Sequence, residues 1–141
     1  RAVLSFNTSG LPDNAVIKKV TLKIRKQGLI GTDPFTTHGS LMAEIRKPFL
    51  GLSAALVIGD FNATVDKVAG LFGLTPVNNW YSVTVGAASY PYVNLLGTTQ
   101  FRLRFQKDDN NDNIADFMRF FSGDHATTSA RPTLIIEYTV P

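Results

Sequence analysis

Apolar and polar residues alternate with a period of two along most of this chain. Clear examples are Ala2, Leu4 and Phe6, then Val20, Leu22 and Ile24, and then Phe101, Leu103 and Phe105. Successive side chains of a β-strand point to opposite faces, so this alternation predicts strands with one face in a core. The same pattern returns around residues 41–45, 80–85, 117–121 and 134–140, and the sequence therefore predicts at least seven strands.

The segments between these strands are rich in turn-forming residues. They cover residues 9–14, 28–39, 70–79 and 122–132. Two further segments could be helical: residues 62–69, after a cap at Asp60 or Asn62, and residues 87–96, which Pro91 keeps short. Many short strands separated by turns predict an all-β fold, an antiparallel β-sandwich or jelly roll with one or two short helical segments.

Composition adds limits to this picture. The 141 residues, 44% of them apolar, suit a single β-sandwich domain over residues 1–141. No apolar run approaches the roughly 20 residues of a membrane span. Cysteine is absent, which excludes disulfides and zinc-thiolate sites. The net charge is +3, yet the densest basic cluster, residues 18–26, alternates with apolar residues as the wet face of a strand does, so we predict no nucleic-acid binding.

Four of the eleven carboxylates lie within residues 108–116, Asp-Asp-Asn-Asn-Asp-Asn-Ile-Ala-Asp. Calcium takes six to eight oxygen ligands, and oxygen-bearing residues at alternating positions of a compact loop can supply them. The predicted ligands are the side chains of Asp108, Asn110, Asp112 and Asp116 and the carbonyl of Ile114. The loop departs from the helix-loop-helix calcium motif, which has Gly where Asn113 stands and Glu where Arg119 stands. We therefore expect a structural calcium ion and no calcium-sensor helix pair.

The alternative is a solvated turn, since Asp and Asn also dominate turns by bonding their own backbone. Clustered carboxylates favour the ion, because they repel one another unless a cation compensates. Calcium would then stabilise a hairpin between the strands around 102–106 and 117–121. Asp60 and Asp66 could join the ligands if their segment lies beside the loop.

Catalysis has little support in the sequence. The two histidines, His38 and His125, lie in polar loops without a partnering nucleophile or metal-binding spacing. Carboxylates gathered in one loop do not offer the opposed acid and base of a glycosidase. We predict that the protein is not an enzyme.

Several segments resemble the DNRLRE-domain family, secreted β-sandwiches that are similar to carbohydrate-binding modules. They are Arg-Ala-Val-Leu-Ser-Phe at the start, Gly-Leu-Pro at 10–12, Gly-Asp-Phe-Asn-Ala at 59–63, Thr-Gln-Phe-Arg-Leu-Arg-Phe at 99–105, Phe-Phe-Ser-Gly-Asp at 120–124 and Arg-Pro-Thr-Leu-Ile-Ile-Glu-Tyr at 131–138. The resemblance spans the whole chain. It implies an extracellular or cell-surface, non-catalytic module of a larger secreted protein.

Family members ordinarily have one or two strands before the segment that matches residues 1–6, so the resemblance implies a sandwich without its N-terminal strands. Either the chain is then the C-terminal module or an incomplete portion of a larger secreted protein, or another copy or a neighbouring domain supplies the strand, because unpaired strand edges accept strand addition. We therefore expect a calcium-stabilised structural or adhesive module, able to assemble into filaments.

The alternative function is that of a carbohydrate-binding module. Trp80, Tyr81, Tyr90 and Tyr92 are the candidate glycan contacts, because an aromatic ring with a polar tip can stack on a sugar while it meets water. Taken singly, each of these rings fits packing in the core or at its rim better than a glycan contact.

Overall fold

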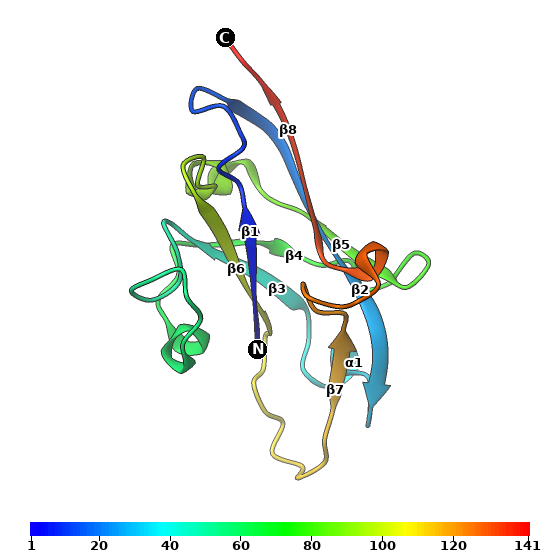
Figure 1. Ribbon diagram of the computed structural model, residues 1–141. Coiled ribbons are helices and arrows are strands. Elements are labelled where there is room, and N and C mark those ends of the chain that lie inside the picture. Colours follow the sequence, from blue (N-terminus) through cyan, green and yellow to red (C-terminus); the bar gives the residue numbers. More distant parts are fainter.

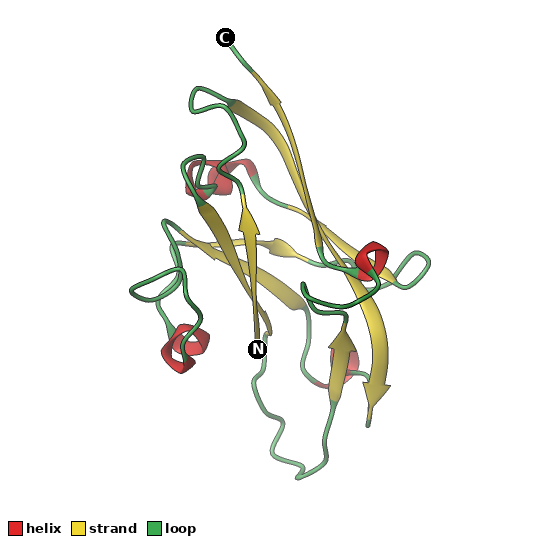
Figure 2. Ribbon diagram, in the orientation of Figure 1, coloured by secondary structure: helices red, strands yellow, loops and turns green.

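The computed structural model describes all 141 residues and confirms the predicted fold class, an all-β sandwich of two antiparallel sheets (Figures 1 and 2). It has eight strands: β1 (Ala2–Asn7), β2 (Val16–Ile30), β3 (Leu41–Arg46), β4 (Lys67–Leu71), β5 (Trp80–Thr84), β6 (Thr98–Phe105), β7 (Phe117–Phe120) and β8 (Thr133–Thr139). The short helices are α1 (Pro34–Thr37) and the 3-10 turns η1 (Ile58–Asn62), η2 (Ala87–Tyr92) and η3 (Thr128–Ala130).

Sheet A has the strand order β1-β6-β3-β4. Sheet B is built on the long strand β2, which pairs with β5 along one edge and with β8 and then β7 along the other. Every connection except β3 to β4 and β7 to β8 crosses between the sheets. Such interleaving is typical of jelly-roll sandwiches, and it brings residues far apart in the sequence together.

The core lies between the sheets and is built from the apolar positions of the alternating pattern. Val20, Leu22 and Ile24 of β2 are fully buried, as are Ala43 and Ile45 of β3. Phe101 of β6 is also fully buried and meets the ring of Phe6 edge-on, at 6.3 Å between centroids. Period-two patterning therefore identified the core-facing positions of β2, β3 and β6 correctly, whereas Ala2 at the start of β1 and Tyr138 near the end of β8 are exposed.

One predicted helix is wrong. Residues 62–69 do not form a helix: η1 ends at Asn62, and β4 pairs with β3 from Lys67 onward. Pairing with β3 satisfies the backbone of Lys67 to Leu71 and buries Ala69, and this tertiary contact overrides a weak local helix signal. The predicted helical piece at 87–96 is confirmed as the 3-10 turn η2.

The outer face of sheet A is covered, although its polar residues suggest an exposed face. Glu44 is 2% exposed and accepts hydrogen bonds from Arg102, at 2.7 Å, and from Arg104, at 2.9 Å. Arg102 also donates to the carbonyl of Ala63, at 2.6 Å, in the loop that joins β3 to β4. This loop lies over the sheet and buries a charged cluster that alternation alone would leave in water.

The two sides of the sandwich differ. On one side, main-chain hydrogen bonds join the sheets, from Gly86 N to the carbonyl of Ala69 at 2.8 Å and from Gly73 N to that of Ser82 at 3.2 Å. On the other side β1 faces β7 and β8, and no main-chain hydrogen bond links β1 to either strand. We call this open side the seam.

Candidate metal-binding loop and open seam

The acidic loop, residues 108–116, joins the end of β6 in sheet A to the start of β7 in sheet B (Figure 1). The expected hairpin between these strands is therefore wrong. β6 pairs with β1 and β3, whereas β7 pairs with β2, because the core between the sheets separates the two strands. The acidic loop therefore crosses from one sheet to the other at one end of the sandwich.

Three of the five predicted calcium ligands converge within this loop. The side-chain amide nitrogen of Asn110 lies 2.7 Å from Asp112 Oδ2 and 3.3 Å from Asp116 Oδ2. Asn111 and Asn113 have left-handed backbones, with φ of 59° and 58°, which lets so short a segment turn back on itself. Asn tolerates this conformation, so the absence of Gly at 113 is structurally compatible with a tight loop.

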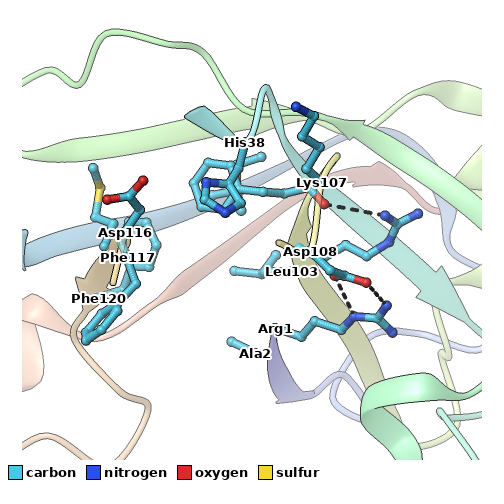
Figure 3. A pocket seen from close by; sticks show the side chains of 13 residues that line it. Arg1, Ala2, His38, Leu103, Lys107, Asp108, Asp116, Phe117 and Phe120 are labelled. Atoms are coloured by element: carbon cyan, nitrogen blue, oxygen red, sulfur yellow. Dashed lines mark hydrogen bonds and ion pairs between the residues drawn. The ribbon is translucent and has the colours of Figure 1, made fainter. Parts of the chain in front are cut away.

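Asp108 lies apart from these three residues. Arg1 donates to both of its carboxylate oxygens, with Arg1 Nε at 3.1 Å from Asp108 Oδ1 (Figure 3). The hydrogen bonds from Arg1 hold the pKa of Asp108 below its ordinary value, and Asp108 in turn raises the pKa of Arg1. Asp108 is about half exposed, so solvent screens the pair and it is worth less than about 1 kcal/mol.

The oxygen-bearing side chains of the acidic loop fit a hard cation only in part. No group of three or more His, Asp or Glu side chains is placed to hold a metal ion. The closest arrangement is one amide between two carboxylates. A half-turn of the Asn110 amide exchanges its nitrogen for its oxygen, which would present three oxygens of the kind that calcium prefers. The chemistry of Asn110, Asp112 and Asp116 therefore suits calcium, whereas Asp108 is committed to Arg1.

Asp116 fastens the acidic loop to the end of β2. Its Oδ1 accepts a hydrogen bond from Thr32 N at 2.8 Å. Beside it Gly31 has φ of +72°, and a Cβ placed there would lie 1.7 Å from the carbonyl oxygen of Ala115. Only glycine permits this approach.

Asp60 and Asp66 do not join the acidic loop through their carboxylates. Asp60 is 1% exposed and accepts from Val57 N at 2.9 Å. Asp66 accepts from Lys47 N at 2.9 Å. Each carboxylate holds the main chain of the β3–β4 connection, a structural role that the sequence did not distinguish from metal ligation.

Two hollows lie along the seam. The first, about 220 Å³, is drawn in Figure 3. Ala2 of β1, Leu103 of β6, and Phe117 and Phe120 of β7 line it, together with Arg1, Lys107 and Asp108 at its mouth. The second, about 380 Å³, lies between Phe6 at the other end of β1 and Leu134 and Ile136 of β8. Apolar side chains thus line the seam at both ends of β1.

The four aromatic candidates for glycan contact do not form one surface. Tyr81 is 2% exposed and stacks on Phe35 at 5.0 Å between centroids; burial also raises its pKa, so its ring is not available to a glycan. Tyr90 and Tyr92 are half-buried against the core.

Trp80 lies on the outer face of sheet B, where Lys23 Nζ is 5.2 Å from its ring centroid. Trp80 pairs with Arg25, whereas the Tyr90 hydroxyl donates to the carbonyl of Lys18. Lys18 and Arg25 are seven residues apart on β2, which is about 23 Å along an extended strand. Trp80 and Tyr90 are therefore too far apart for one sugar to bridge.

Sequence reasoning missed the buried cluster of Glu44, Arg102 and Arg104 and the fully buried Gln100 beside it. The available signal was chemical: Glu44 and the arginines occupy the same outward face of predicted strands. Opposite charges on a shared face favour pairing. The burial of these side chains could not be predicted, because the residues that cover them belong to the connection between β3 and β4.

Comparison with known proteins gives no relative to set beside this geometry: no family model, no curated protein and no solved structure matches the chain. None of the helices has both the length and the apolar character that a membrane crossing needs.

Proposed function

We propose that this chain is a non-catalytic extracellular structural or adhesive module of the DNRLRE type, which assembles with other copies by accepting a strand along the seam. The observation that supports it is the asymmetry of the sandwich. One side is closed by main-chain hydrogen bonds, whereas the other is lined by apolar hollows and has β1 as an unpaired edge.

The chemistry of the seam favours a peptide strand as its occupant. An unpaired strand edge offers a row of N–H and C=O groups that another extended chain can satisfy. The two hollows lie near Ala2 and Phe6, and every second side chain of an added strand would face them. Burial of apolar area supplies the driving force.

Assembly predicts that the protein associates as its concentration rises. Ala2 is exposed and lines the first hollow, so Ala2→Glu places a charge in the seam and should weaken association at least about tenfold. Light scattering after size-exclusion chromatography measures the association, and electron microscopy reveals filaments. The matched control is Ser82→Glu on the outer face of sheet B, which should associate as the parent does. A parent protein that stays monomeric at high concentration contradicts assembly.

We further propose that calcium binds at Asn110, Asp112, Asp116 and the Ile114 carbonyl and stabilises the link between the sheets. At a calcium concentration a hundredfold above Kd, the free energy of unfolding should rise by about 2.7 kcal/mol. For a chain of this size that is a rise in Tm of roughly 9 °C. A chelator should reverse it, as measured by calorimetry.

Asp112→Ala and Asp109→Ala form a matched pair for this experiment. Asp112 and Asp109 each accept one main-chain hydrogen bond at 2.8 Å, from Ile114 and Asn111 respectively. Only Asp112 belongs to the proposed ligands. Asp112→Ala should therefore lose the calcium response while Asp109→Ala keeps it. Identical Tm values in calcium and in chelator would contradict calcium binding by this loop.

Carbohydrate binding is the second candidate function, and the position of Trp80 favours it. Trp80 lies beside Lys23 on the outer face of sheet B, where Ser82 and Thr84 add exposed hydroxyls. Affinity electrophoresis in polysaccharide gels should show retardation that Trp80→Ala reduces about tenfold. Tyr138→Ala, which removes an aromatic ring of 41% exposure on β8, is the control. Equal mobility with and without polysaccharide counts against this function.

A further inference from the structure

The connection between β3 and β4, residues 47–66, projects from the sandwich on the left of Figure 1. Residues 48–59 contain no charged side chain. Leu52 is 98% exposed and Ile58 is 89% exposed, and Leu56 and Val57 are each more than half exposed. Four aliphatic side chains in water on one loop are unusual for a protein without a partner, because a contiguous apolar patch marks an interaction site.

The outgoing limb of this loop is held by Gln100 of β6. Gln100 is 1% exposed, accepts from Leu50 N at 2.8 Å and donates to the carbonyl of Ala54 at 2.9 Å. These bonds satisfy a buried amide and fix the main chain on both sides of Leu52. The exposure of Leu52 therefore belongs to a fastened segment.

The returning limb is held by two arginines. Arg1 donates to the carbonyl of Phe61 at 2.8 Å, and Arg102 donates to that of Ala63 at 2.6 Å. Polar side chains of Arg1, Gln100 and Arg102 thus hold the loop from inside, while Leu52, Leu56, Val57 and Ile58 face outward. This is the reverse of an ordinary loop, which turns polar groups to water.

We propose that this loop attaches the protein to an anionic lipid surface by shallow insertion of Leu52, Leu56, Val57 and Ile58. The tip of the loop, residues 52–58, has a composition that favours lipid over a protein partner. Protein interfaces are anchored by Trp, Tyr and Arg with directional contacts. The tip has none of these residues, and its only hydroxyl, that of Ser53, bonds to the carbonyl of Ala55 at 3.3 Å. Aliphatic side chains suit the boundary between lipid headgroups and acyl chains, where no directional contact is needed.

The charges at the base of the loop complement anionic headgroups. Arg46 and Lys47 leave β3 where Ile45 pairs with Lys67, so three basic residues gather where both limbs meet the sheet. The two carboxylates of the loop, Asp60 and Asp66, face main-chain N–H groups. Basic residues beside an apolar tip add attraction to an anionic surface.

The backbone sets the depth of insertion. The N–H groups of residues 52–56 make no hydrogen bond within the protein. Such groups need water or headgroup oxygens and are not stable in the hydrocarbon core. The tip therefore lies at the boundary of headgroups and acyl chains.

Vesicle flotation of the 141-residue chain tests this proposal, with phosphatidylcholine vesicles with and without phosphatidylglycerol. The parent should float with the anionic vesicles and bind the neutral ones more weakly. Leu52→Ser with Ile58→Ser should lower partitioning at least about tenfold. Both side chains are nearly fully exposed, so this variant should keep the Tm of the parent. Val68→Ser with Leu71→Ser is the control, since it removes two side chains of 52% exposure from β4 and should float as the parent does.

Three results would overturn the proposal. They are a parent that does not float with anionic vesicles, equal flotation of the loop variant and the parent, and a drop in molar mass of the loop variant by light scattering. The last would mean that a second copy covers the loop. Flotation and the difference in molar mass between the loop variant and the parent report on the loop, whereas Ala2→Glu reports on the seam and the chelator comparison reports on calcium. This proposal and the proposed function can therefore fail separately.

Discussion

Glu44→Gln should lower the free energy of unfolding by about 3 kcal/mol, although it changes one oxygen to a nitrogen. Glu44 is 2% exposed and is the only carboxylate that pairs with Arg102 and Arg104. Without its charge, the guanidinium of Arg102, whose side chain is 6% exposed, stays buried and uncompensated. Removing one partner of a buried ion pair costs far more than the pair contributes, because desolvation of the remaining charge is no longer offset.

The measurement is thermal or denaturant unfolding, in which about 3 kcal/mol corresponds to a drop in Tm of roughly 10 °C for a chain of this length. The matched control is Glu137→Gln. Glu137 meets Lys19 at 3.4 Å, and both side chains are more than half exposed, so the change should cost less than about 1 kcal/mol. Equal effects of the two substitutions would show that the loop does not shield the cluster from water.

Gly31→Ala should destabilise the protein by at least about 3 kcal/mol. Gly31 has φ of +72°, a left-handed conformation that costs other residues about 1–2 kcal/mol. In addition, the new Cβ would lie 1.7 Å from the Ala115 carbonyl oxygen and 2.7 Å from Asp116 Oδ1. The acidic loop must move away from β2 to make room, which breaks the hydrogen bond from Thr32 N to Asp116.

Two measurements separate this effect from general instability. Unfolding gives the free energy, and amide hydrogen exchange should show faster exchange at Thr32 than in the parent. Gly10→Ala is the control, because Gly10 has no neighbour within 4 Å and no left-handed backbone, so its change should be neutral or slightly stabilising. A Gly31→Ala protein with parental stability and exchange would mean that the loop does not rest against β2.

The contacts within the acidic loop could be predicted from the sequence, whereas the contacts that the loop makes with distant residues could not. The acidic loop was visible in the sequence as Asp and Asn at close spacing, and Asn110, Asp112 and Asp116 do converge. Its anchoring at Gly31 was not visible, because Gly31 is 85 residues from Asp116 in the chain and glycine is common in turns. The pairing of Asp108 with Arg1, across 107 positions, was hidden for the same reason.

The structure of the connection at residues 47–66 was the hardest to predict from the sequence. Its sequence reads as an apolar stretch with a helix signal after it, and local propensity is too weak to decide between helix, strand and coil there. In the structure one limb ends in β4, and the rest covers the polar face of sheet A. Gln100 and Arg102, which alternation assigns to a wet face, become buried anchors as a result.

The sequence by itself determined the all-β class, most strands and the residues that face the core, because a period of two in hydrophobicity has one structural solution for strands with a buried face. It also indicated which residues gather in the acidic loop, since Asn110, Asp112 and Asp116 lie close together in the chain, and calcium at this loop stays a prediction. Only the tertiary structure decided that the acidic loop bridges two sheets, that the open side of the sandwich lies between β1 and the strands β7 and β8, and that a charged cluster is buried under an apolar loop. Each of these features joins residues distant in the chain, and such contacts depend on the free energy of the whole fold, which no local pattern encodes.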